Sequence, residues 1–155
     1  MTTRSTQLWA EEEFGESWLK DARSRRRLID VAAGAAERPD GTITRSFKSQ
    51  AQRTGAYRLF RGIDGAMPEQ IAVGPHIACA QRSRDAQFVY VPIDGSSLNI
   101  TDDAGTKGLG LIGARKDHAH GLQVMTAIAV EADGTPVGVC AQQYWTRLRR
   151  STRGK

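Results

Sequence analysis

Cysteine is scarce in this chain, since only two of its 155 residues, Cys79 and Cys140, carry a thiol. Two thiols cannot build the dense disulfide framework of a small secreted domain, and neither has further ligands at a metal-binding spacing. Both lie in otherwise apolar segments. We therefore expect reduced thiols that pack in a core.

Long apolar runs are also missing. The longest, such as Ala127 to Val130, fall far short of the roughly 18 residues that a membrane span needs. The N-terminus has no apolar signal core. With 39% hydrophobic and 25% charged residues, the composition is that of an ordinary globular protein. The sequence therefore predicts a cytoplasmic protein with one domain, or one and a half.

Acidic residues are few between Ser17 and Gly62, where four of them face eleven lysines and arginines in a chain of net charge +5. Basic helices can simply be solvated. The tight run from Arg23 to Arg27 and the pair Tyr57-Arg58 nevertheless favour a polyanionic partner, most commonly DNA or RNA, and DNA is the hypothesis taken further. The residues expected to bind DNA, mainly through phosphates, are Lys20, Arg23, Arg25, Arg26, Arg27, Arg45, Lys48, Arg53, Tyr57, Arg58 and Arg61.

The periodicity of the first half predicts helices. A short helix over Leu8 to Phe14 would carry Glu11, Glu12 and Glu13 in its first turn, and Asp21 would cap a second helix over Ala22 to Ala36. A third is expected to begin after Thr44 or Ser46 and to stop at Gly62. A fourth would run from Pro68 to about Arg84, broken or kinked at Gly74-Pro75.

After Arg84 the pattern changes to that of strands. Phe88 to Ile93 is apolar and β-branched, and Ser97 to Thr101 continues it or forms a second strand. Gln123 to Glu131 and Val137 to Trp145 flank a segment of hairpin composition. Pro92 must either direct its nitrogen away from a neighbouring strand or lie at a bulge. The fold class predicted is α+β, with an all-helical region followed by antiparallel strands.

Asp94 follows the apolar run directly, where a carboxylate would be held rigidly and still reach water. Such a carboxylate suits a Mg²⁺ ion, which prefers hard oxygen ligands. Asp94-Gly95 is also a strong hairpin signal, so these residues alone leave a turn and a metal ligand both open.

Two further motifs carry little weight. Gly108 to Gly113 matches the spacing of a dinucleotide-binding loop, but it follows a polar segment and precedes a poor helix former. His118 and His120 have no additional ligands at metal-binding spacing and are interpreted as loop surface.

Several segments together carry a resemblance to a family. They are Trp9 to Phe14, Leu19 to Arg23, Arg27 to Ala32, Gly55 to Arg61, Ile93 to Leu98, Gly121 to Met125 and Gln143 to Arg147. In this order they resemble bacterial cut-and-paste DDE transposases of the Tn-five type, within the insertion-sequence-four group. Ser24 departs from the family, whose members often have a second consecutive arginine there.

The resemblance implies a helical, transposon-end-binding domain over residues 1–86 and the start of an RNase H-like catalytic core over 87–147, followed by a basic tail over 148–155. It makes Asp94 the first catalytic aspartate and a Mg²⁺ ligand. The family's second aspartate and its glutamate lie far downstream of the first. We therefore expect a truncated or fragmentary transposase whose catalytic core is incomplete.

The partners implied are double-stranded DNA at transposon ends and a full-length transposase, and no membrane. The resemblance also places the protein with the nucleoid in the cytoplasm. The alternative from another class is a stand-alone DNA-binding protein that occupies transposon ends and inhibits transposition. Independent catalysis is the least favoured hypothesis.

Overall fold

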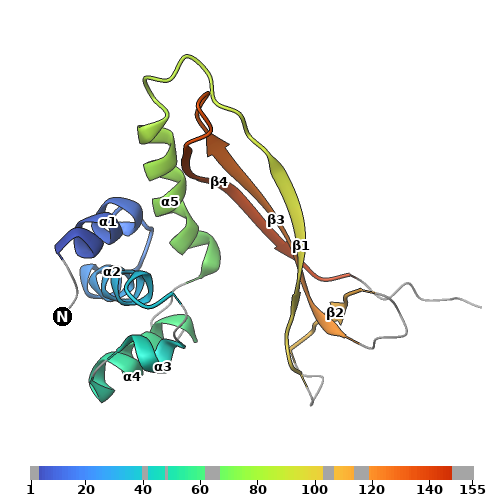
Figure 1. Cartoon of the computed structure of the whole chain (residues 1–155). Helices are drawn as coiled ribbons and strands as arrows, with labels where there is room; N and C mark the ends of the chain where they lie inside the picture. The colour runs from blue at the N-terminus through green and yellow to red at the C-terminus, as the bar shows by residue number, and fades with distance from the viewer. Residues whose placement is uncertain are drawn as a thin grey trace, which may run out of the picture. The chain divides into compact units, whose positions relative to one another are not determined.

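The computed structural model describes residues 4–39, 42–47, 49–61, 67–102, 107–113 and 119–147. The chain divides into two compact units, Met1–Ala86 and Gln87–Lys155. We call them the helical unit and the sheet unit. The order of helices followed by antiparallel strands confirms the α+β class (Figure 1).

The helical unit contains five helices: α1 (Arg4–Phe14), α2 (Ala22–Ala36), α3 (Ile43–Ser46), α4 (Gln50–Phe60) and α5 (Pro68–Arg82). The prediction for α2 is confirmed at both ends, because the Asp21 carboxylate accepts the Ser24 N–H at 2.7 Å and fixes the first turn. Helix α1 begins a turn earlier than expected, so its three glutamates do not lie in the first turn.

The start predicted for the third helix is wrong, since Thr44 and Ser46 lie within the short helix α3. Helix α4 begins after Ser49, whose hydroxyl accepts the Gln52 N–H at 3.2 Å while the Gln52 side chain accepts the Ser49 N–H at 3.3 Å. This reciprocal capping satisfies two backbone donors at the helix start. It explains why α4 begins at Gln50.

Two apolar clusters hold these helices together. Leu19, Leu28 and Leu59 form one, against which Phe14 and Ile71 pack, and Val31, Phe47 and Ala56 form the other. Because α2 contributes Leu28 and Val31 and α4 contributes Ala56 and Leu59, one turn of each helix packs against the other. An ion pair of 2.8 Å between Glu13 and Arg82 also joins α1 to α5.

Helix α5 contains Pro75, which has no N–H to donate to the carbonyl of Ile71. The loop between α1 and α2 supplies donors at this point. The Ser17 hydroxyl donates to the Ile71 carbonyl at 2.9 Å, and the Trp18 N–H donates to the Gln70 carbonyl at 3.0 Å. Helix α5 therefore runs unbroken from Pro68 to Arg82, so of the two outcomes predicted at Gly74-Pro75, a break or a kink, the break is wrong.

The sheet unit contains β1 (Ile93–Asn99), β2 (Gly110–Leu111), β3 (His120–Val130) and β4 (Pro136–Trp145). All pairs are antiparallel; β3 pairs with β1, β2 and β4. The predicted hairpin of β3 and β4 is confirmed, and Gly134 adopts φ 92° in its turn. The Asp133 carboxylate accepts the Thr135 N–H there at 2.9 Å.

The expected strand over Phe88 to Ile93 is wrong in its bounds, because the ladder of β1 begins where that prediction ended. Tyr90 forms an isolated bridge with Val130 in the same register as the pair Ile93 and Ala127. Pro92 therefore faces Ile128, whose N–H donates to the Pro92 carbonyl at 3.2 Å. Proline cannot return that bond, so both earlier explanations of Pro92 fail: its nitrogen faces β3, and β1 has no bulge there.

Candidate nucleic-acid interface

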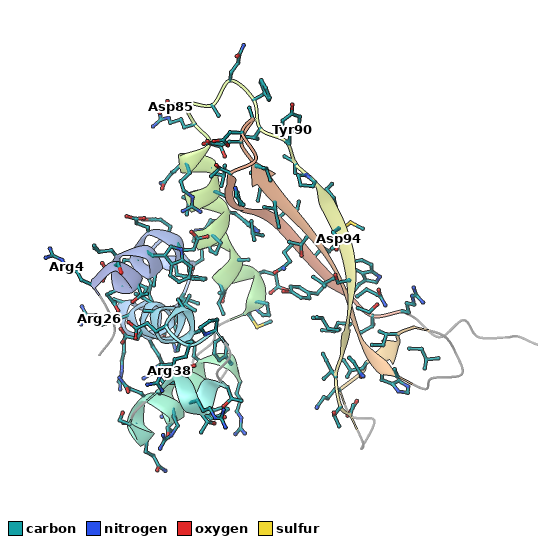
Figure 2. The ribbon with its side chains drawn as sticks, in the orientation of Figure 1. Arg4, Arg26, Arg38, Asp85, Tyr90 and Asp94 are labelled. Atoms are coloured by element: carbon teal, nitrogen blue, oxygen red, sulfur yellow. The ribbon has the colours of Figure 1, made fainter. Side chains whose placement is uncertain are left out.

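The exposed cations of the helical unit include Arg23 and Arg26 of α2, Arg45 of α3 and Arg58 in the C-terminal half of α4. Figure 2 shows Arg4, Arg26 and Arg38 along one side of this unit. The side chains predicted to bind DNA that are exposed are Lys20, Arg23, Arg26, Arg45, Tyr57, Arg58 and Arg61. Lys48 lies outside the described residues. The exposed set is the part of the prediction best placed to meet a polyanion.

Three predicted arginines are only partly exposed and have structural neighbours. A Cβ on Gly55 of α4 would lie 2.8 Å from Nε of Arg27, so the absence of a side chain there makes room for this guanidinium. The Arg53 guanidinium donates to the Phe47 carbonyl at 3.3 Å. Nε of Arg25 is buried with no hydrogen-bond partner among the described residues. These side chains help to fix the surface from which the exposed cations project.

Helices α3 and α4 are linked by side chains. The hydroxyls of Thr44 and Tyr57 lie 3.1 Å apart and share a hydrogen bond. Arg38, beyond the end of α2, donates to the Arg45 carbonyl at 2.5 Å. These two hydrogen bonds connect the end of α2 to α3 and connect α3 to α4.

Helix α4 presents polar side chains that sequence reasoning did not select. Gln50 and Thr54 are exposed on its first two turns, on the helix that also carries Arg58. Such amide and hydroxyl groups can bond to base edges in the major groove, whereas arginine also grips phosphate. The capping sequence Ser49-x-x-Gln52 was the signal that could have located this N-terminus.

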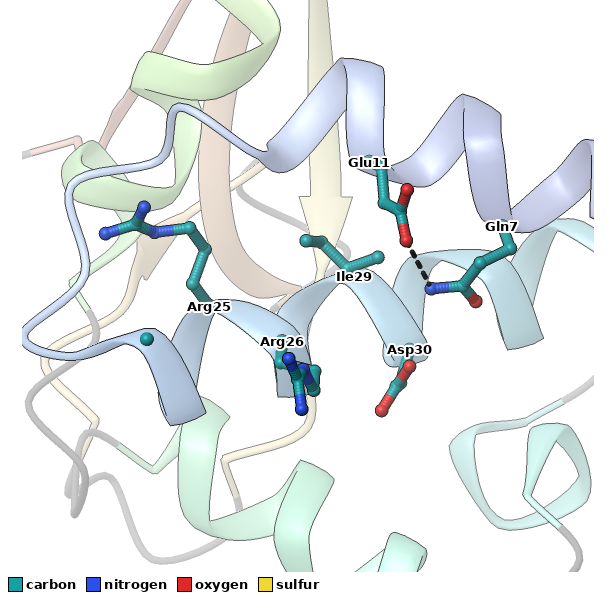
Figure 3. Close-up of a pocket in the computed structure, with 7 residues that line it drawn as sticks. Gln7, Glu11, Arg25, Arg26, Ile29 and Asp30 are labelled. Carbon is teal, nitrogen blue, oxygen red and sulfur yellow. Dashed lines mark hydrogen bonds between the residues drawn. The ribbon is translucent and has the colours of Figure 1, made fainter.

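Acidic groups near the basic helices are few and partly engaged. The Ser24 N–H donates a hydrogen bond to the Asp21 carboxylate and lowers the pKa of Asp21. This carboxylate is therefore engaged in capping α2. Desolvation raises the pKa of Asp30. Figure 3 shows Asp30 with Glu11, Arg25 and Arg26 around a pocket of about 310 Å³ between α1 and α2. Because two acids face two arginines there, this pocket is not a basic site.

Asp94 is the second residue of β1 and is exposed. It pairs with Thr126 of β3, and Gly95 pairs with Met125, so the interpretation of Asp94-Gly95 as a turn is wrong. The Ser96 hydroxyl lies 3.5 Å from the carboxylate. Within the described ranges, no three His, Cys, Asp or Glu residues gather in a group that could hold a metal ion. These residues do not fit a complete Mg²⁺ site.

The remaining candidate motifs have structural explanations. In the glycine-rich segment, Gly110 and Leu111 form β2 and pair with β3, so the segment does not connect a strand to a helix. His118 lies outside the described residues, and His120 begins β3. Neither cysteine forms a disulfide; Cys79 is buried and Cys140 is partly exposed. Among the helices described, none is long and apolar enough to cross a membrane.

Residues 6–62 match a protein-family model described as transposase DNA-binding. The match begins within α1 and ends just after α4, so it includes every exposed side chain of the predicted DNA-binding set. The helical unit is therefore similar to the N-terminal DNA-binding domain of transposases. This confirms the expected resemblance at the level of transposases, with DNA as the implied partner.

Proposed function

We propose that the helical unit binds double-stranded DNA at transposon ends, as the DNA-binding part of a cut-and-paste DDE transposase of the Tn-five type. The observation that carries this proposal is the exposure of Arg23, Arg26, Arg45, Arg58 and Arg61 within the residues that match the transposase model. Cations spread over three packed helices can contact several phosphates at once. Few unengaged acids oppose them.

Helix α4 is the element we propose for the major groove. It is capped at its start, and it exposes Gln50 and Thr54 before Arg58. Arg61, directly after the helix, is exposed as well. Recognition helices in helix-turn-helix proteins contact base edges with their N-terminal residues. In this arrangement Arg23 and Arg26 of α2 contact the phosphate backbone and fix the register.

The test is DNA binding by the full chain as a function of salt. With about five phosphates contacted, log affinity should fall against log salt with a slope near −4.5. Replacing both Arg23 and Arg26 by alanine should weaken binding and reduce that slope by about 1.8. Arg27 is left intact because it lies against Gly55.

The matched control is Arg84→Ala, an exposed cation of the helical unit beyond the end of α5 and outside the matched residues. This variant should keep the wild-type slope. An affinity that does not depend on salt, or that the Arg23 and Arg26 replacements leave unchanged, would contradict the proposed function.

For the sheet unit we propose the start of an RNase H-like core. Three of its strands form a meander in which β3 lies between β1 and β4, and Asp94 is on the first of them. That order supports the position assigned to Asp94 by the resemblance. Its single carboxylate does not complete the two-metal arrangement that phosphodiester cleavage uses.

The second candidate function is inhibition of transposition. The observation that favours it is that the helical unit exposes many cations that could bind DNA, whereas the sheet unit offers only one carboxylate, Asp94, at the expected catalytic position among the described residues. A chain that occupies transposon ends without cutting them would compete with a full-length transposase. The discriminating measurement is strand transfer by a complete transposase with increasing amounts of this chain. Inhibition that the Arg23 and Arg26 replacements abolish would favour competition for DNA.

A further inference from the structure

Strand β1 uses only alternate backbone groups to bind β3. Tyr90 exchanges bonds with Val130, the Pro92 carbonyl accepts from Ile128, and the Ile100 N–H donates to His120 at 3.0 Å. In an antiparallel ladder the bonding side alternates with every residue. Asp94, Ser96 and Leu98 therefore bond to β3. The N–H and C=O groups of Ile93, Gly95, Ser97 and Asn99 point to the other side of β1.

No described strand pairs with that other side of β1. All seven residues of β1 are exposed, and the paired register with β3 is unbroken from Ile93 to Asn99. Figure 1 shows β1 along the side of β3 away from β4. A regular strand with a row of unpaired backbone groups is a template for another strand.

The opposite edge of the sheet differs. The pairing of β4 with β3 has register shifts between Ala127 and Ile128 and between Ala129 and Val130, and β4 begins at Pro136. Bulges and proline are features that prevent strand pairing at an edge. Each chain therefore has one sheet edge that is suited to strand pairing, the edge formed by β1. With one such edge per chain, association should stop at a dimer and not continue into a fibre.

We propose that β1 pairs with β1 of a second copy of this chain, antiparallel and centred on Ser96. In this register Asp94 lies opposite Leu98 of the other copy, and Gly95 lies opposite Ser97. The only charge on β1 thus meets no like charge across the pair. The outward groups of Ile93, Gly95, Ser97 and Asn99 form the hydrogen bonds of the dimer.

The side chains of β1 support a second copy of β1 as the pairing partner. Lysine and arginine, which commonly protect edges, are absent from Ile93 to Asn99, and serines at its centre are small enough for close approach. The pairing joins the two sheets into one. It is independent of the DNA-binding surface, so either proposal can fail without the other.

Substitutions at Gly95 provide the test, because a Cβ built there has no neighbour within 4 Å. Gly95→Lys places two lysines as diagonal neighbours across the dimer, whereas Gly95→Ala adds a side chain without charge. The full chain and both variants are compared without DNA by sedimentation equilibrium. We expect wild type and Gly95→Ala to dimerise alike and Gly95→Lys to dissociate at least tenfold more readily.

A second variant tests the outward hydrogen bonds. Ser97→Pro removes one outward N–H and leaves the backbone bonds from β1 to β3, but it also removes the hydroxyl that donates to Gln123 of β3 at 3.0 Å. Ser97→Ala, which loses only that hydroxyl, is its control: Ser97→Pro should weaken the dimer and Ser97→Ala should not, with circular dichroism to check the fold. In wild type, the amides of Gly95 and Ser97 should gain protection from hydrogen exchange as concentration rises, while those of Ser96 and Leu98 stay protected at all concentrations. A monomeric wild type, oligomers larger than a dimer, or a dimer unchanged by Gly95→Lys overturns the proposal.

Discussion

Gly74 shows how one missing side chain determines the packing of the helical unit. A Cβ at this position would lie 2.5 Å from Oγ of Ser17 and 2.8 Å from the carbonyl oxygen of Glu13. The close approach lets the Ser17 hydroxyl reach the carbonyl that Pro75 leaves without its helical donor. Gly74 and Pro75, which separately weaken a helix, here form a docking point for the loop between α1 and α2.

We predict that Gly74→Ala destabilises the chain by about 1–3 kcal/mol, because the loop must move away from α5. Urea denaturation followed by circular dichroism measures the change. Gly95→Ala is the matched control, since its new Cβ would have open space and should alter stability little. Equal midpoints for wild type and Gly74→Ala would show that the loop adjusts without cost.

Asp21 provides a prediction that depends on pH. Hydrogen bonding from the Ser24 N–H lowers its pKa in the folded chain. Its contribution to stability is therefore present above the unfolded pKa and is lost as pH falls through the lowered folded value. We expect Asp21→Ala to melt at a lower temperature than wild type at pH 7 and the difference to shrink in acid. A difference independent of pH would mean that the charge of Asp21 is irrelevant to capping.

Asp30 should behave in the opposite way. Desolvation raises its pKa, so the folded state is relatively favoured by protonation and this contribution is lost as pH rises through the folded value. We expect Asp30→Asn to be more stable than wild type at pH 7, with the gain disappearing below the unfolded pKa. Thermal melting at several pH values measures this. A loss of stability at pH 7 would contradict it.

At the scale of elements, the sequence identified α2 and the hairpin of β3 and β4 because local signals agreed. Asp21, the apolar period and the end at Ala36 all indicate one helix. The start of α4 was missed because Thr44, Ser46 and Ser49 are all acceptable caps when each is considered alone. The signal that distinguishes them is Gln52, because of the three candidates only Ser49 has a glutamine three residues later.

The bounds of β1 were missed for a related reason. Phe88 to Ile93 has the composition of a strand, but pairing with β3 is interrupted where Pro92 faces Ile128. Asp94 and Gly95, which also favour a turn, belong to the regular ladder instead. Likewise, the sequence selected the arginines of α2 and α4, but burial separates the exposed Arg23 and Arg26 from the partly buried Arg25 and Arg27.

Helix α4 provides a prediction that separates affinity from specificity. Arg61→Ala should reduce the salt slope of DNA binding by about 0.9, because one phosphate contact is lost. Gln50→Ala should leave the slope unchanged and lower the preference for a cognate end over an unrelated duplex by about 1–3 kcal/mol. Competition binding at two salt concentrations measures both. If Gln50→Ala leaves the preference intact, another element reads the sequence.

At the scale of the whole chain, apolar exposure is unequal between the two units. Nine of the fifteen large hydrophobic side chains exposed among the described residues belong to the sheet unit, including Ile93, Met125 and Trp145. A sheet normally covers its apolar residues with another layer. We therefore expect amides of α2 and α5 to exchange hydrogen more slowly than those of β4, as measured by mass spectrometry of the full chain. Slower exchange in β4 would show that the sheet is the more stable unit.

The isolated position of Asp94 leads to a prediction about chemistry. The purified chain should neither nick nor join DNA with Mg²⁺ or Mn²⁺, because the described residues offer no second and third carboxylate beside Asp94. A supercoiled plasmid assay with wild type and Asp94→Asn checks this. Metal-dependent nicking that disappears in Asp94→Asn would contradict the prediction, whereas nicking by both proteins would indicate a contaminant.

The docking of the loop between α1 and α2 on α5 also has a consequence for proteolysis. Trp18 is 70% exposed, and chymotrypsin cuts after such side chains. Its N–H is bound to Gln70, however, and its neighbours Ser17 and Leu19 are buried. A protease needs an extended stretch of backbone, so cleavage here requires the loop to detach from α5. Phe88 is exposed outside any helix or strand. Brief digestion should therefore cut after Phe88 first, and the most exposed tryptophan should resist until the helical unit unfolds.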